Sequence, residues 1–339
     1  MLSITLDTSA LEAFFSLFSS VRRGVSPSSE AIRALVALPV MRHLVDHYNL
    51  PMGSDAGMSS ADLADVLAHV GSKTYDGHGP FLSSLHRRYR EDCARLDAFS
   101  RAFAVLDTGG LPAEVEARVT PYVPAGADLA CTVYLLCTGH SGGYFHGDGI
   151  SLDWGYVHES SDTLAATIAH EVHHLVYNGI VSGMAPVDAP CSLAFEVLTG
   201  LVGEGIAYAC VGGVPSVGER GYDEFMSDSA REKEHCQTIS TCFEDIATGA
   251  MASVEDLYAW ASTHMRSTFG AINYTGYRMM RAIDAAGGAR AVVACITDPW
   301  RTIDAYHAAC DALGDDTAPR FSDEAAAYLR GCGVASSGR

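Results

Sequence analysis

The pentapeptide His170-Glu171-Val172-His173-His174 carries the residues best suited to chemistry in this chain. It places two histidines four residues apart, with a glutamate directly after the first. Residues four apart on a helix lie on the same face, so the imidazoles of His170 and His174 could bind one metal ion. Such a pair suits zinc, and Glu171 could act as general base toward a zinc-bound water. The motif therefore predicts zinc-dependent hydrolysis.

The flanking sequence predicts a helix around this motif. Ser161 or Asp162 could cap its N-terminus, and Asn178-Gly179 is a common helix stop. Apolar residues recur between these ends at helical spacing, so one face of the helix can be buried. They are Leu164, Ile168, Val172 and Leu175. The motif thus lies in the middle of the predicted helix. The alternative is a helix whose histidines only pair with polar groups of the core.

A catalytic zinc site needs a third protein ligand and an open fourth position. Two glutamates, Glu196 and Glu204, lie in the next predicted helix, residues 190–211. Glycines flank Glu204 on both sides, and small neighbours would let this helix approach the first one closely. Bulky residues flank Glu196 instead. We therefore favour Glu204 as the third ligand, with Glu196 as the alternative.

The motif H-E-x-x-H followed by E-G-x-A, here Glu204-Gly205-Ile206-Ala207, resembles the gluzincin metallopeptidases. The likeness is strongest to poorly characterised zinc-dependent peptidases that carry an E-G-x-A third-ligand motif. It covers roughly residues 130–285. The resemblance implies a zincin-like catalytic core, Zn2+ as cofactor, a peptide or protein substrate, and Glu204 as the third ligand. Glu171 would then take a proton from the zinc-activated water and pass it to the leaving amine.

The oxyanion of a tetrahedral intermediate needs a hydrogen-bond donor besides the metal. Tyr274 and Tyr277 lie on either side of Gly276. Similar peptidases have a tyrosine near a glycine at the start of a late helix. We therefore favour Tyr274 as a catalytic residue, with Tyr277 and His264 as further candidates. Core packing is the alternative, because apolar residues follow this tyrosine.

A glycine-rich stretch, residues 141–152, is the candidate substrate rim. It follows residues 130–137, whose β-branched and aromatic side chains predict a strand. In zincins an edge strand pairs with extended substrate, so Gly142, Gly143 and Tyr144 could bind a peptide backbone by strand addition. The alternative is an ordinary turn between two strands. Three other residues of the loop have a spacing that favours a surface loop over a second metal site: His140, His146 and Asp148.

The remaining pattern predicts a predominantly helical α+β fold, with a small mixed sheet before the H-E-x-x-H helix. Residues 9–106 are predicted helical, with a capping box at Ser9-x-x-Glu12 and a break at Pro39. Strands are predicted within residues 113–154. Helices follow from residue 161 to the C-terminus, including 190–211, 222–248, 253–265, 273–286, 288–296, 300–313 and 321–331.

The best candidate boundary is Gly109-Gly110-Leu111-Pro112. It would separate an N-terminal helical region, residues 1–110, from a zincin-like metallopeptidase region, residues 111–339. The two regions could also form one continuous domain. The chain offers 339 residues, of which 48% are hydrophobic, and this is ample for a large core in one domain or two.

Composition restricts the partners and the compartment. The net charge of −19 argues against binding of nucleic acid and of anionic membranes. The first residues lack the basic and apolar regions of a signal peptide, and no stretch approaches the roughly 18 apolar residues of a membrane span. The ten cysteines are scattered, without C-x-x-C, which favours reduced, packed thiols. The expectation is a cytoplasmic protein.

Two other classes of protein compete with the peptidase. A carboxylate-bridged di-iron protein would use two E-x-x-H motifs, and the chain has them at Glu171-x-x-His174 and Glu232-x-x-His235. The required fourth helix is missing, because strand and glycine-rich loop precede the first motif. A zincin-like protein could also bind metal or a partner without catalysis. Glu171 counts against that reading, since a site that only binds metal needs no base.

Overall fold

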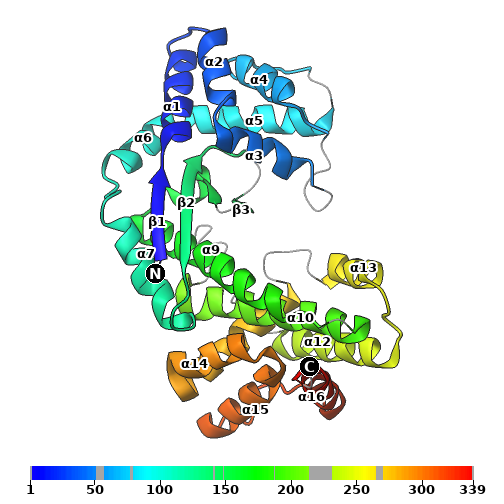
Figure 1. Cartoon of the computed structure of the whole chain (residues 1–339). Coiled ribbons are helices and arrows are strands. Elements are labelled where there is room, and N and C mark those ends of the chain that lie inside the picture. Colours follow the sequence, from blue (N-terminus) through cyan, green and yellow to red (C-terminus); the bar gives the residue numbers. More distant parts are fainter. Residues whose placement is uncertain are drawn as a thin grey trace. The chain divides into compact units, whose positions relative to one another are not determined.

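A computed structural model describes residues 2–50, 57–76, 79–139, 142–147, 149–186, 188–213, 231–264 and 270–337 (Figure 1). The strands are β1 (Leu2–Asp7), β2 (Leu129–Leu136), β3 (Gly143–His146) and β4 (Gly149–Asp153). The first helices are α1 (Ser9–Arg22), α2 (Ser29–Val36), α3 (Pro39–Tyr48), α4 (Ser60–Ala68), α5 (Pro80–Ala94), α6 (Leu96–Ala104), α7 (Leu111–Val119) and α8 (Trp154–Val157). The later helices are α9 (Ser161–Val181), α10 (Ala189–Ile206), α12 (Glu232–Thr248), α13 (Val254–His264), α14 (Ala271–Thr297), α15 (Thr302–Leu313) and α16 (Asp323–Ser337).

The chain forms two compact units. The N-terminal unit consists of Ser3–Glu114 and Ala130–Ala165. The C-terminal unit consists of Met1–Leu2, Val115–Leu129 and Ala166–Arg339. Each unit is thus built from segments that lie far apart in the sequence. The division into residues 1–110 and 111–339 stays a prediction. The predominantly helical α+β class with a small mixed sheet is confirmed.

Helices α1, α2, α4 and α5 pack against one another in the N-terminal unit (Figure 1). The predicted break at Pro39 is confirmed, because this proline occupies the first turn of α3. The predicted capping box at Ser9 and Glu12 is wrong. The Ser9 N–H is bound by the Asp7 carboxylate at 2.8 Å, and helix α1 begins after Thr8, whose hydroxyl donates to Glu12 at 2.7 Å.

The sheet has the strand order β1-β2-β4-β3. Strand β4 is parallel to β2, with Val133 opposite Ile150, and antiparallel to β3, with Tyr144 opposite Ser151. All five residues of β4 are buried, as expected for an interior strand of a sheet covered on both faces. Strand β3 lies at an edge. Strand β1 was not predicted, since its sheet neighbour β2 lies more than a hundred residues away.

The strand prediction for residues 113–128 is wrong. Helix α7 occupies Leu111–Val119, and a short 3-10 turn follows at Thr120–Tyr122. Alanine, glutamate and arginine dominate this segment, and these residues favour a helix over a strand. The Asp107 side chain accepts hydrogen bonds from the N–H groups of Gly109 and Gly110, which sets the turn before the helix. The sheet therefore begins again only at β2.

Helix α10 is the central helix of the C-terminal unit, where it packs against α12, α14 and α16 (Figure 1). Among the described residues, Pro190–Val211 is the stretch long and apolar enough to cross a membrane by length and composition, and most of it is buried inside the fold. The predicted helices 273–286 and 288–296 form one element, α14, with a kink at Gly288, whose φ is 68°. Glycine adopts this angle readily.

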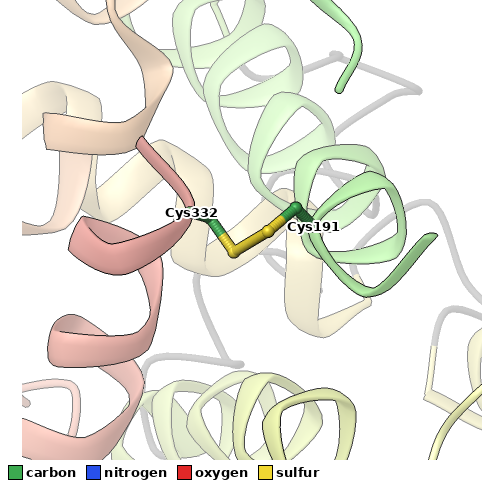
Figure 2. The surroundings of a disulfide bond; sticks show 2 residues. All are labelled: Cys191 and Cys332. Atoms are coloured by element: carbon green, nitrogen blue, oxygen red, sulfur yellow. A yellow bond between two sulfur atoms is a disulfide. The ribbon is translucent and has the colours of Figure 1, made fainter. Parts of the chain in front are cut away.

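A disulfide joins Cys191, in the first turn of α10, to Cys332 in α16 (Figure 2). The expectation that all cysteines are reduced is therefore wrong for this pair. The other eight cysteines are free, and seven of them are buried. Sequence spacing could not reveal the pair, because 141 residues separate its two members.

Candidate metal centre

Helix α9 presents the two histidines of the H-E-x-x-H motif. Most of the predicted apolar face is buried: Leu164, Ile168 and Val172 are at most 1% exposed, and Leu175 is half-buried. The hydroxyl of Ser160, rather than of Ser161 or the carboxylate of Asp162, caps the helix by accepting the Thr163 N–H at 3.0 Å. The helix also continues beyond the predicted stop to Val181, and both Asn178 and Gly179 are exposed on it.

The structure brings His170, His174 and Glu204 together within the C-terminal unit. The Nε2 atoms of the two histidines lie 3.0 Å apart. One Glu204 oxygen lies 3.6 Å from His174 Nε2, and the other lies 3.9 Å from His170 Nε2. Of the described residues, these three form the one group of histidine, cysteine or carboxylate side chains close enough to hold a metal ion.

The donor set and its spacing fit zinc. Two imidazoles and one carboxylate are a common ligand set of catalytic zinc sites, with a fourth position left open. Ligands about 2.0–2.1 Å from a tetrahedral zinc ion lie about 3.3 Å from one another. The observed separations of 3.0, 3.6 and 3.9 Å bracket that value. A zinc ion could therefore be bound with small adjustments of the side chains.

Glycines let α10 and its neighbours approach closely enough to place Glu204. A Cβ atom on Gly203 would lie 2.8 Å from the Tyr177 ring of α9. A Cβ atom on Gly205 would lie 2.6 Å from the backbone carbon of Gly276 in α14. Real Cβ atoms do not come this close to other atoms. The predicted role of the small residues beside Glu204, close helix packing, agrees with these contacts.

The pKa values of Glu171, His170 and His174 are all shifted, in ways that suit a general base next to a metal-binding site. Burial raises the pKa of Glu171 to about 7; the charge of His174 opposes this shift and that of Glu204 adds to it. Burial, together with His174, lowers the pKa of His170 to about 3, so its ring is neutral and able to bind a metal. Burial alone would lower the pKa of His174, but the hydrogen bond to Glu204 together with the charges of Glu204 and Glu171 outweighs it, and the net pKa is raised.

The alternative third ligand lies elsewhere. Glu196 is exposed on α10 and does not belong to the His170–His174–Glu204 cluster. Two turns of helix separate it from Glu204. His173, the remaining histidine of the motif, is fully buried and its ring stacks on Tyr177 with 5.9 Å between centroids. It therefore packs in the core.

The predicted tyrosine candidates lie on α14. Tyr274 is 2% exposed, and its ring centroid lies 5.6 Å from that of His235 in α12. The hydroxyl of Tyr277 accepts a hydrogen bond from Arg281 at 3.0 Å. His264, at the end of α13, packs against Trp260. A catalytic role for these residues stays a prediction.

A different tyrosine, Tyr208, contacts a metal-ligand candidate directly. Its ring meets the His170 ring edge to face, with 4.6 Å between centroids. It is 4% exposed and hydrogen-bonds to Asn273 of α14. No sequence motif pointed to this residue. Its position four residues after Glu204 could have indicated a shared helix face.

The candidate substrate rim belongs to the N-terminal unit. Gly143 and Tyr144 begin the edge strand β3, and the carbonyl of Gly142 accepts the Asp153 N–H at 2.9 Å. The Tyr144 side chain is 6% exposed and stacks on His47, so only its backbone could pair with a substrate. Substrate binding here stays a prediction. His146 hydrogen-bonds to Ser151, whereas His140 and Asp148 lie outside the described residues.

The second E-x-x-H motif is engaged in a different interaction. Glu232 accepts a hydrogen bond from Arg278 at 2.6 Å, and this ion pair is about three-quarters buried. An arginine is a poor neighbour for an iron-binding carboxylate. Glu232 and His235 do not join the cluster on α9 and α10. The di-iron alternative is therefore disfavoured by the arrangement of the described residues.

The described structure is a predominantly helical protein in which His170, His174 and Glu204 could together hold a zinc ion. Comparison with known families also points to zinc. Residues 32–314 match the family described as "Putative zinc dependent peptidase (DUF5700)". This match spans most of the chain, so the protein belongs to that family. No curated protein and no solved structure matches the chain. The suspected relation to zinc-dependent peptidases is thereby confirmed.

Proposed function

We propose that this protein is a zinc-dependent peptidase whose metal ion is held by His170, His174 and Glu204. The observation that carries the proposal is the approach of these three side chains, on two helices, with Glu171 directly beside them. The family match supports the same activity. The three ligands leave a fourth position for water or substrate, which a catalytic zinc site requires.

Glu171 is the proposed general base. A zinc ion bound here would supply a Lewis acid and lower the pKa of a bound water. The Glu171 carboxylate accepts the proton of the attacking water and then delivers it to the leaving amine. A base works best when its pKa lies close to the working pH, and burial raises the pKa of Glu171 to about 7. The carboxylate is therefore suited to both transfers near neutral pH.

The proposed substrate is a peptide or protein in extended conformation. Strand β3 is one of the two edge strands of the mixed sheet, and edge strands are where an extended peptide can add to a sheet. Gly142 and Gly143 add no side chain that would block such a backbone.

Tyr274 is the proposed donor to the oxyanion. Neither nucleic acid nor membrane is a proposed partner, because the net charge is −19.

The test is the variant Glu171→Gln, which keeps the size of the side chain and removes its basicity. We expect one zinc ion per chain in both proteins, measured by elemental analysis, because Glu171 is not a ligand. Cleavage of a peptide library, followed by mass spectrometry, should fall by at least 100-fold in the variant. Wild-type cleavage rates in the variant would refute the mechanism. Zinc binding without any cleavage by the wild type would indicate a non-catalytic zincin-like protein.

A further inference from the structure

Helix α10 changes its winding directly after Glu204. Residues Ala207–Val211 form a single π-helical turn, in which the carbonyl of Ala207 accepts the N–H of Gly212 at 2.8 Å. A π-helix pairs groups five residues apart and is rare, and most examples are single turns at functional sites. We refer to residues 207–212 as the π-turn. The π-turn makes three separate contacts with His170, all within the C-terminal unit.

The first contact is with the backbone carbonyl of Ala207, which lies near enough to the ring of His170 to act as a hydrogen-bond acceptor. The Nε2 atom of this ring faces His174 and Glu204, so the carbonyl meets the other nitrogen, Nδ1. A proton on Nδ1 leaves Nε2 unprotonated and available as a ligand. Histidines that bind metals generally donate their second nitrogen to such a partner, which fixes both tautomer and ring orientation.

The second contact is the ring of Tyr208. It meets the His170 ring edge to face, with 4.6 Å between centroids and 64° between the planes. Tyr208 is 4% exposed, so its ring is held by packing, and it also hydrogen-bonds to Asn273 of α14. The tyrosine ring therefore limits rotation of the imidazole on one side, while the Ala207 carbonyl holds its Nδ1 atom.

The third contact is the close approach of Gly212 to α9, the helix that carries His170. A Cβ atom here would lie 2.6 Å from the carbonyl oxygen of Ala166 and 2.7 Å from the Cβ of His170. No side chain larger than hydrogen fits unless the backbone moves. The end of the π-turn thus rests against α9 at His170 itself.

We infer that the π-turn positions His170 for zinc, through the Ala207 carbonyl, the Tyr208 ring and the close fit of Gly212. These residues do not touch the ion and are positioning residues. The π-turn directly follows the last α-helical turn of α10. Glu204 and the residues that contact His170 therefore lie on consecutive turns of one continuous helix. The inference rests on the proposed zinc site but not on peptide cleavage.

The first test compares Gly212→Ala with Gly179→Ala. Gly179 is a matched control, because it lies on α9 and an added Cβ there meets nothing within 4 Å. We expect Gly212→Ala to weaken zinc binding by about 10–100-fold, the usual effect of losing the support of a metal-binding histidine. Affinity is measured by competition with a chromogenic chelator. Gly179→Ala should bind zinc as the wild type does.

The second test separates positioning from general stability. Tyr208→Phe keeps the ring and should stay within about threefold of wild-type zinc affinity, whereas Tyr208→Leu should lose about tenfold or more. The visible spectrum of the cobalt-substituted protein should change in Tyr208→Leu, since it reports on ligand geometry. The melting temperature of each metal-free variant is measured alongside. A loss of affinity explained entirely by unfolding of the metal-free variant would overturn the inference.

The outcomes distinguish this inference from the proposed function. Wild-type zinc affinity and an unchanged cobalt spectrum in both Gly212→Ala and Tyr208→Leu would refute positioning by the π-turn, even if the protein cleaves peptides. Weakened zinc binding in these variants would support it, even if no peptide is cleaved by the wild type. Peptide cleavage is therefore not a readout of either test.

Discussion

Glu204 decides whether the histidine pair becomes a three-ligand zinc site. It is the residue of α10 whose oxygens lie 3.6 and 3.9 Å from the two imidazoles. Glu204→Ala should remove a ligand and reduce zinc to well below one ion per chain after dialysis, measured by elemental analysis. Glu196→Ala is the matched control on the same helix, since Glu196 is exposed and was the alternative ligand. Full zinc content in Glu204→Ala, with loss in Glu196→Ala, would reverse the assignment.

The histidine pair could be predicted from the sequence because its geometry is local, whereas Glu204, on another helix, was favoured from its flanking glycines and the E-G-x-A resemblance. His170 and His174 are one helical turn apart, and the glycines beside Glu204 pointed to a close helix contact. Tyr208 was not predicted, and neither was the π-helical turn that contains it. A π-turn depends on contacts with other helices, here with Asn273 and with His170, and single-sequence spacing carries little information about it.

At the scale of elements, the α10–α14 contact holds the site together. Gly205 and Gly276 let the two backbones meet without intervening side chains. Gly205→Ala should destabilise the protein by about 2 kcal/mol or more, since the added Cβ collides with backbone that cannot move aside easily. Urea unfolding followed by circular dichroism measures the effect. Gly179→Ala, in open space on α9, should be neutral or slightly stabilising. Equal stability of the two variants would show that α10 and α14 leave room for a methyl group at residue 205.

The boundaries of elements were less predictable than their existence. The break at Pro39 follows from a local steric rule and was correct. Strand β1 and helix α7 were not predicted. Strand β1 depends on a sheet neighbour that comes from residues 129–136, and no local pattern reveals such a long-range pairing.

Two buried carboxyl groups make the N-terminal unit sensitive to pH. Burial raises the pKa of Asp92, in α5, to about 6, and burial with the charge of Asp92 raises the pKa of Asp153, the last residue of β4, to about 7. Both ordinary values are 3.8. Between the ordinary pKa of 3.8 and the raised values of about 6 and 7, these carboxyl groups are protonated in the folded state and ionised in the unfolded state. The free energy of unfolding should therefore fall as pH rises from about 4 to about 7.

Asp92→Asn should flatten this dependence and raise stability at about pH 8 by more than about 1 kcal/mol, because one pKa unit corresponds to about 1.4 kcal/mol. Urea unfolding at several pH values between about 5 and 8 measures it. Glu91→Gln is the control, since this neighbour on α5 is exposed and its ion pairs contribute little. An unchanged slope in Asp92→Asn would show that the buried pair does not cause the pH dependence.

At the scale of the whole molecule, composition predicted a large core but not how the chain is divided. The sheet segment, residues 130–165, belongs to the same unit as the N-terminal helices, whereas residues 115–129 belong with the metal centre. Such interleaving depends on strand pairing between distant segments. The cytoplasmic location inferred from scattered cysteines stays a prediction. The disulfide of the C-terminal unit favours an oxidising compartment instead, where disulfides persist.

The Cys191–Cys332 disulfide should therefore stabilise the protein measurably. It closes a loop across 141 residues, and the chain-entropy model assigns about 5 kcal/mol to such a loop. A reducing agent, or Cys332→Ser, should lower the melting temperature, and the agent should have little further effect on the variant. Cys310→Ser is the matched control, because Cys310 is buried but free. Alkylation of the unfolded, unreduced wild type should label eight of its ten cysteines. Labelling of all ten would show that the thiols are reduced and would support the cytoplasmic location.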